Sequence, residues 1–185
     1  MSTKREHNTT SDRLLRAGTF YHREAAKCLR GKAYFAASVM QVAVLEAMLR
    51  AMCSIETPDV KKTNEYRKKE NSKKGFRRKR DRALEFNLYE LINIARELHW
   101  FPSKIVRSGG RRTDLARFAH EIRETRNFLH PDRMARRRKV QMRSFDDVYE
   151  VFEVAKSWLE HHNEQQLLKR MEREERRQRK LGGSR

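Results

Sequence analysis

The segment from Lys32 to Cys53 most constrains the fold, because apolar side chains lie on nearly every side of it in a helical projection. A helix that is apolar almost all round is a central, buried one. No segment alternates apolar and polar residues in the way a half-buried strand does. The sequence therefore predicts an all-α fold, a bundle of about five helices packed around this segment.

Amphipathic patterns predict four further helices. The first is expected to start at an N-cap, Ser11 or Asp12, and to end at Gly31. The others are expected at residues 83–100, at 113–131 with Thr113 or Asp114 as the cap, and at 144–163. The predicted organisation is a disordered N-terminus over residues 1–10, a helical domain over 11–162, and a charged helical or disordered tail over 163–185.

The chain carries 44 Lys and Arg against 25 Asp and Glu, a formal net charge of +19. The positive excess lies mostly in residues 61–82 and 104–143, whereas the apolar side chains lie elsewhere. Such a balance favours a polyanionic partner, above all a nucleic acid. It also fits a charge that only keeps the protein soluble, or a basic segment that binds an acidic protein.

Residues 61–82 have no helical pattern, so they are interpreted as an open basic insertion between helices. Tyr66 and Phe76 interleave with its cations and are candidates for stacking on bases. The alternative is a solvated loop. Two basic runs are candidate contacts to a phosphate backbone. The first consists of Arg77, Arg78, Lys79 and Arg80, and the second of Arg136, Arg137, Arg138 and Lys139.

Neither the cysteines nor the histidines have the spacing of a metal site, so neither a metal nor a cofactor is expected. Cys28 and Cys53 lie in helical apolar patterns and are interpreted as buried thiols in a reducing compartment. His161-His162 is interpreted as an exposed helix face. No apolar run is judged long enough to span a bilayer, so the expectation is a cytoplasmic protein without membrane attachment.

Arg123, Arg126 and His130 lie at spacings of three and four on the predicted helix that ends at Pro131. This spacing places them in one sector, beside the apolar stripe. Two guanidinium groups and an imidazole suit metal-independent RNA cleavage, in which histidine moves the proton of the ribose 2′-OH or of the leaving oxygen and the arginines stabilise the charged transition state. The same spacing also fits a histidine at a helix C-cap beside two solvated arginines.

The stretch Arg123-Glu124-Thr125-Arg126-Asn127-Phe128-Leu129-His130-Pro131 resembles the signature of the HEPN superfamily (higher eukaryotes and prokaryotes nucleotide-binding domain). Six residues separate Arg123 from His130, which fits that signature, whereas only three separate Arg126 from His130. The segment Val44–Leu49 is similar to a core helix of these proteins. The resemblance covers roughly residues 12–160 and implies a homodimeric helical bundle, often an endoribonuclease that acts as a toxin or in antiphage defence.

Three further polar residues each have two interpretations. The resemblance implies that Asn127 steadies a phosphate or the His130 ring; otherwise it is solvated. Glu46 either orients Arg126 or Asn127 from inside the bundle or pairs with Arg50 four residues on. His120 is placed in a different helical sector from His130 and is expected to be exposed.

Three functions are consistent with these features. The leading hypothesis is an RNA-directed, homodimeric endoribonuclease, with His130 as acid or base and Arg123 and Arg126 on phosphate. The second is a non-enzymatic nucleic-acid or ribonucleoprotein-binding module on the same scaffold. The third is a partner-binding subunit of a larger assembly, docked through the charged tail after His162. An antitoxin or a larger complex is a candidate partner.

Overall fold

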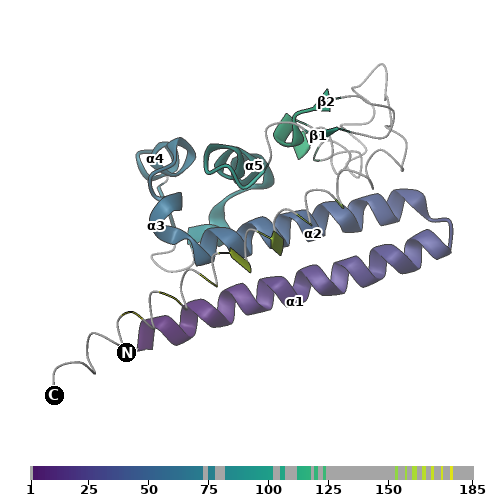
Figure 1. The fold of residues 1–185 in the computed structure, drawn as a ribbon, viewed down its shortest axis with the longest axis horizontal. Helices are drawn as coiled ribbons and strands as arrows, with labels where there is room; N and C mark the ends of the chain where they lie inside the picture. The colour runs from purple at the N-terminus through teal and green to yellow at the C-terminus, as the bar shows by residue number, and fades with distance from the viewer. Residues whose placement is uncertain are drawn as a thin grey trace.

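The computed structural model describes residues 2–72, 75–77, 82–101, 105–106, 112–117, 119–120 and 123. Beyond these it describes nine single positions, at 153, 157, 160, 161, 164, 165, 168, 172 and 176. Side chains are described from residue 10 onward, except those of the short strands. Two long antiparallel helices form one layer, and the shorter elements pack against the second of them (Figure 1).

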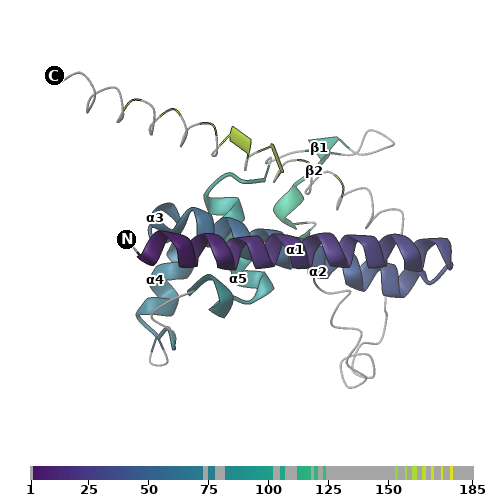
Figure 2. The ribbon, with the colours of Figure 1, turned by 90° about the horizontal axis from the view of Figure 1, so that it is seen from below.

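The first layer consists of α1 (Ser2–Arg30) and α2 (Tyr34–Ile55), which lie side by side along most of their length in both views (Figures 1 and 2). The predicted cap of α1 is wrong, because the backbone is helical from Ser2 and both Ser11 and Asp12 lie inside the helix. Residues 2–10 contain neither glycine nor proline, so nothing in them forces the helix to begin at a capping residue.

Helix α2 is the core helix that its pattern predicted. Val42, Leu49 and Ala51 have no exposed surface, and α2 contacts α1 on one side and α5 on another. Contrary to the sequence-based expectation, this 22-residue helix is long and apolar enough to cross a membrane. More than half of its apolar window (56%) is buried inside the protein, which is compatible with a soluble protein.

Helices α1 and α5 end in the same way, on a residue with left-handed backbone conformation that is not glycine. Lys32 has φ 58° and His99 has φ 55°. Beyond each of them a backbone N–H returns to a carbonyl five residues earlier, from Ala33 to Cys28 and from Trp100 to Ala95 (both 2.8 Å). This is the hydrogen bonding of a Schellman motif. The chain therefore leaves α1 through Lys32, one residue after the predicted Gly31.

The basic insertion contains regular structure, which the sequence analysis did not predict. The short helix α3 (Thr57–Val60) leads to α4 (Asn64–Glu70). Thr63 caps α4, and the Glu97 carboxylate accepts the Asn64 N–H at 2.9 Å. A carboxylate at a helix N-terminus stabilises the helix. These anionic and capping contacts, together with burial of Tyr66, explain why α4 forms despite the many lysines around it.

The helix predicted over residues 83–100 is two elements, a 3₁₀ turn η1 (Arg82–Glu85) and helix α5 (Leu88–Glu97). The break is at Asn87, whose side chain accepts the Glu90 N–H at 3.0 Å, while the Glu90 carboxylate accepts the Asn87 N–H at 2.7 Å. This reciprocal capping box fixes the start of α5. Helix α5 then buries one face, including Leu91, Ile92 and Ile94, against α2.

The prediction of an all-α fold is confirmed. One departure is a pair of two-residue antiparallel strands, β1 (Ile105–Val106) and β2 (Arg112–Thr113). A helix follows, described at residues 115–117, 119–120 and 123. Asp114 caps it by accepting the Arg117 N–H at 3.1 Å, as one of the two predicted caps. Leu115 and Ala119 of this helix are buried in the core.

Candidate functional site

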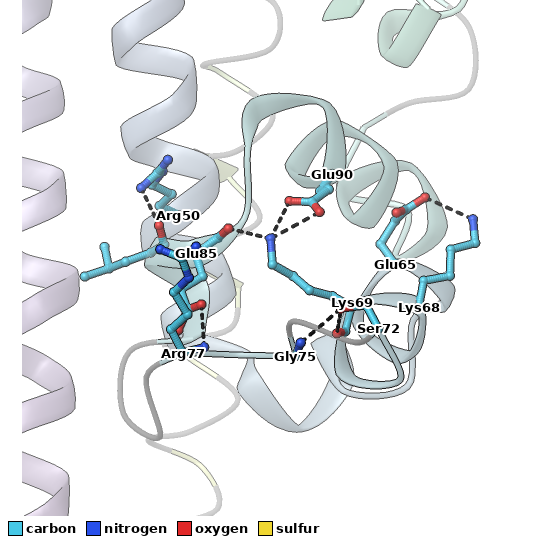
Figure 3. A pocket seen from close by; sticks show the side chains of 10 residues that line it. Arg50, Glu65, Lys68, Lys69, Ser72, Gly75, Arg77, Glu85 and Glu90 are labelled. Atoms are coloured by element: carbon cyan, nitrogen blue, oxygen red, sulfur yellow. Dashed lines mark hydrogen bonds and ion pairs between the residues drawn. The ribbon is translucent and has the colours of Figure 1, made fainter.

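A cavity of about 820 Å³ with charged walls lies between α2, α4, η1 and α5 (Figure 3). Its volume falls within the range of sites that bind small ligands. Cations and carboxylates alternate around its wall. The cations are Arg50, Lys68, Lys69 and Arg77, and the carboxylates are Glu65, Glu85 and Glu90.

Lys69 forms hydrogen bonds that join the elements around this cavity. Its Nζ donates to both carboxylate oxygens of Glu90, at 2.9 and 3.1 Å, and to the backbone carbonyl of Glu85. The same ammonium lies 5.2 Å from the centre of the Phe86 ring. Lys69 thus ties α4 to both η1 and α5. Since its donors are engaged by the protein, its role is structural.

Arg50 lines the cavity from α2 and pairs with Glu46 of the same helix. The Arg50 guanidinium donates to Glu46 Oε1 at 2.7 Å and to the Leu84 carbonyl at 2.9 Å. The two side chains are 23% and 17% exposed, so the pair is half-buried. Of the two interpretations of Glu46, the structure supports the pair with Arg50. The alternative partners, Arg126 and Asn127, lie outside the described residues.

Glu65 lies at the other end of the cavity and belongs to a chain of hydrogen bonds that leaves it. Glu65 Oε1 accepts from Asn93 Nδ2 at 3.1 Å and from Lys68 Nζ at 3.4 Å. Asn93 Oδ1 in turn lies 3.1 Å from Nε2 of His120. Because Asn93 uses its amide nitrogen on Glu65, its oxygen faces the imidazole as an acceptor. Nε2 of His120 therefore carries the proton.

His120 is half-buried, and the expectation that it is exposed is wrong. Its ring lies 4.9 Å from the ring of Tyr89 on α5, and the hydrogen bond to Asn93 fixes its other edge. The helical wheel could not show that α5 would pack against the sector that carries His120.

Arg123 is the one member of the predicted Arg-Arg-His stripe that the structure describes. It is half-buried, and its guanidinium carbon lies 5.1 Å from the centre of the Tyr89 ring. Such a cation–π contact holds the guanidinium in place. Arg126, Asn127 and His130 lie outside the described residues, so the structure does not test their proximity to Arg123.

Arg77 is the described member of the two basic runs, and it is exposed at the cavity (Figure 3). Its backbone N–H donates to Glu85 Oε2 at 2.8 Å, which fixes the loop that carries it. Outside the described residues lie the other candidate phosphate contacts: Arg78, Lys79, Arg80, Arg136, Arg137, Arg138 and Lys139.

The suggestion that Tyr66 stacks on bases is wrong. Tyr66 is only 2% exposed, and its ring packs against Phe76 at 4.9 Å and Phe86 at 6.3 Å. Phe76 packs on the same core cluster. These aromatic residues anchor the basic insertion to the core. The described aromatic residue near the cavity that does face solvent is Tyr89, which is 46% exposed.

A second cavity, of about 300 Å³, lies between α1 and α2 and has mostly apolar walls that include Leu15, Met48 and Met52. Its lining does not suit a polyanion. In the described part of the chain, no group of three or more His, Cys, Asp or Glu is placed to hold a metal ion. His161 is exposed and interacts with Gln165 of its own helix at 2.9 Å.

Sequence reasoning missed Tyr89, Asn93 and Glu65. A signal was present for the first two, since Tyr89 and Asn93 are four residues apart on the polar side of an amphipathic helix. No protein-family model, curated protein or solved structure matches this chain.

Proposed function

We propose that this protein binds RNA through its cationic surface. The observation that carries the proposal is how charge is distributed. The net charge is +19, and the carboxylates of Glu46 and Glu90 already pair with Arg50 and Lys69 of the same protein. The positive excess therefore remains for a partner. A polyanion gains from such a surface by releasing its bound counterions.

We further propose that RNA meets the helix after Asp114, where the HEPN-like motif lies. Arg123 supports this, because it lies on the same helix as the motif and its half-buried guanidinium lies against the Tyr89 ring. A guanidinium fixed at a half-buried position is suited to a phosphate. In the catalytic form of the proposal, His130 moves the proton while Arg123 and Arg126 stabilise the phosphorane-like transition state. Asn127 then steadies the phosphate or the His130 ring.

The experiment that tests catalysis compares the wild-type protein with His130→Ala on labelled single-stranded RNA in EDTA. The endoribonuclease proposal predicts cleavage by the wild type and at least a hundredfold loss in the variant. His161→Ala, which changes an exposed histidine outside the motif, is the matched control and should cleave normally. Equal cleavage by both variants would exclude His130 as the acid or base.

The same assay distinguishes an endoribonuclease from a protein that only binds RNA. A non-enzymatic module shifts the RNA in a native gel but yields no product. The cationic run that begins at the exposed Arg77 is then the feature to neutralise. Replacing residues 77–80 with alanine removes four positive charges from this run, whose first residue lines the cavity. Loss of the shift in that variant supports backbone binding through this run.

A homodimer also belongs to the proposal, because the HEPN resemblance implies one. Exposed aromatic side chains on the α1–α2 hairpin support it, among them Phe20 at 58% and Tyr34 at 51% exposure. Light scattering on the purified protein tests this directly. A mass near 22.2 kDa would show a monomer and contradict it.

A further inference from the structure

The charged cavity offers more than a set of structural ion pairs, because three of its charged side chains, Glu65, Lys68 and Arg77, keep hydrogen-bonding capacity for a ligand. We propose that the cavity binds a ribonucleotide of single-stranded RNA and that Glu65 recognises the ribose 2′-OH. This inference rests on the proposed RNA binding and names a specific subsite for it, on a different element from the Arg-Arg-His stripe.

Glu65 is held ready to accept a further hydrogen bond. Asn93 from α5 and Lys68 from the next turn of α4 both donate to Oε1. The 3.1 Å hydrogen bond from Asn93, on a different helix, holds Oε1 in place. An ionised carboxylate has acceptor sites for about four hydrogen bonds. No hydrogen bond within the described residues uses Oε2, and the side chain lines the cavity at 15% exposure.

The cavity also presents cations for phosphate groups. Arg77 and Lys68 lie at different sides of the opening (Figure 3). No ion pair among the described residues includes the Arg77 guanidinium, and Lys68 is 72% exposed with only a long contact to Glu65. Arg50 and Lys69, by contrast, are engaged by protein oxygens. Arg77 and Lys68 are therefore the phosphate-binding cations of this subsite.

The mixture of charges favours RNA over a simpler anion. A site for free phosphate does not need carboxylates on its wall, since they repel it. A ribonucleotide, however, brings hydroxyl donors together with its phosphate. An ionised carboxylate is an acceptor only, so it suits the 2′-OH donor. The 2′-OH is also the group by which a protein distinguishes RNA from DNA.

The test measures fluorescence anisotropy with three labelled single-stranded probes of the same length, namely oligouridylate, its 2′-O-methyl form and oligodeoxyuridylate. Methylation removes the hydroxyl donor while leaving the phosphates unchanged. The wild-type protein should bind oligouridylate about tenfold more tightly than either other probe, as expected for one hydrogen bond to a charged group.

Glu65→Ala should lower the ratio of affinities, oligouridylate over either other probe, to less than two. Glu65→Gln preserves the shape of the side chain and should lower that ratio by a factor of at least three. Glu97→Ala is the matched control. It also removes a carboxylate that contacts α4, but Glu97 does not line the cavity. Because both changes raise the net charge equally, only the ratio of affinities is diagnostic. Thermal unfolding, monitored by circular dichroism, identifies a variant that fails to fold. If Glu65→Ala does not fold, Glu65→Gln alone tests the role of Glu65.

The outcomes separate this inference from the proposed function. Tight binding of oligouridylate, with a preference that Glu65→Gln and Glu97→Ala both leave intact, would overturn the Glu65 assignment while RNA binding stands. Equal affinity of the wild type for all three probes would also overturn it. Failure to bind any probe at low salt would instead refute RNA binding itself.

Discussion

Trp100 donates its indole N–H to the Glu56 carboxylate at 3.1 Å inside the core, where the two residues are 1% and 7% exposed. Glu56 ends α2, and Trp100 follows α5, so this hydrogen bond connects the C-terminal ends of the two core helices. A buried polar group that loses its partner costs about 1–3 kcal/mol. The bond therefore fixes how α5 sits on α2.

The first prediction concerns this bond. Glu56→Ala should lower the free energy of unfolding by about 2 kcal/mol, because it leaves the indole N–H buried without this acceptor. Glu56→Gln retains an acceptor and should cost less. Urea denaturation measures both. If Glu56→Ala were as stable as the wild type, the bond would have no structural role.

The second prediction concerns the left-handed residues that end α1 and α5. Lys32→Gly and His99→Gly should each raise the free energy of unfolding by about 0.5–1 kcal/mol, because glycine adopts positive φ without the steric cost of a Cβ atom. Lys61→Gly is the control, since Lys61 has φ −62° and should not be stabilised by this change. Destabilisation by both glycines at 32 and 99 would contradict the observed helix ends.

The third prediction separates two tyrosines that the sequence alone does not distinguish. Tyr66→Ala should lower stability by about 3–5 kcal/mol, as for other large aromatic residues removed from a core. Tyr89→Ala should cost less than about 1 kcal/mol, since Tyr89 is half exposed and loses mainly its contacts with His120 and Arg123. Thermal unfolding compares the two, and the reverse order of costs would contradict the packing of the basic insertion.

The fourth prediction concerns pH. Burial raises the pKa of the Cys53 thiol far above its usual value, and the charge of Glu56 acts in the same direction. Above the unfolded-state pKa of about 8.5, the unfolded chain loses this proton and the native protein keeps it. The native state then binds more protons, so stability falls with rising pH, by about 1.4 kcal/mol per pH unit from this group.

Urea denaturation between pH 8 and pH 10 measures that slope. Cys53→Ala should be less stable at neutral pH, because it leaves a cavity, but its stability should fall less steeply with pH. An unchanged slope in Cys53→Ala would show that other groups cause the pH dependence.

The sequence was sufficient to predict the all-α class and the central helix, because a helix that is apolar on nearly every side, as α2 is, favours burial. It was not sufficient to place the ends of α5 or to predict α4. The capping signal at Asn87 and Glu90 was present but competed with a continuous apolar stripe. The contacts that stabilise α4 come from Glu97 and Glu90, which are distant in sequence.

The candidate site was predicted less completely. The role of Arg123, which was inferred from spacing within one helix, stays a prediction. Glu46 was given two interpretations, of which the pair with Arg50 is the one observed. The cavity and the chain from Glu65 through Asn93 to His120 depend on how three helices pack. Spacing within one helix gives no information about such contacts, since each residue comes from a different element.

The salt dependence of RNA affinity tests the central claim most directly. Anisotropy of a labelled single-stranded RNA, titrated with the full protein at several salt concentrations, gives the slope of log Kd against log salt. Each phosphate contact to a single strand contributes about 0.7 to that slope. We predict a slope of about 2 or more, corresponding to at least about three contacts. No binding at low salt, or an affinity independent of salt, would contradict RNA binding by this cationic surface.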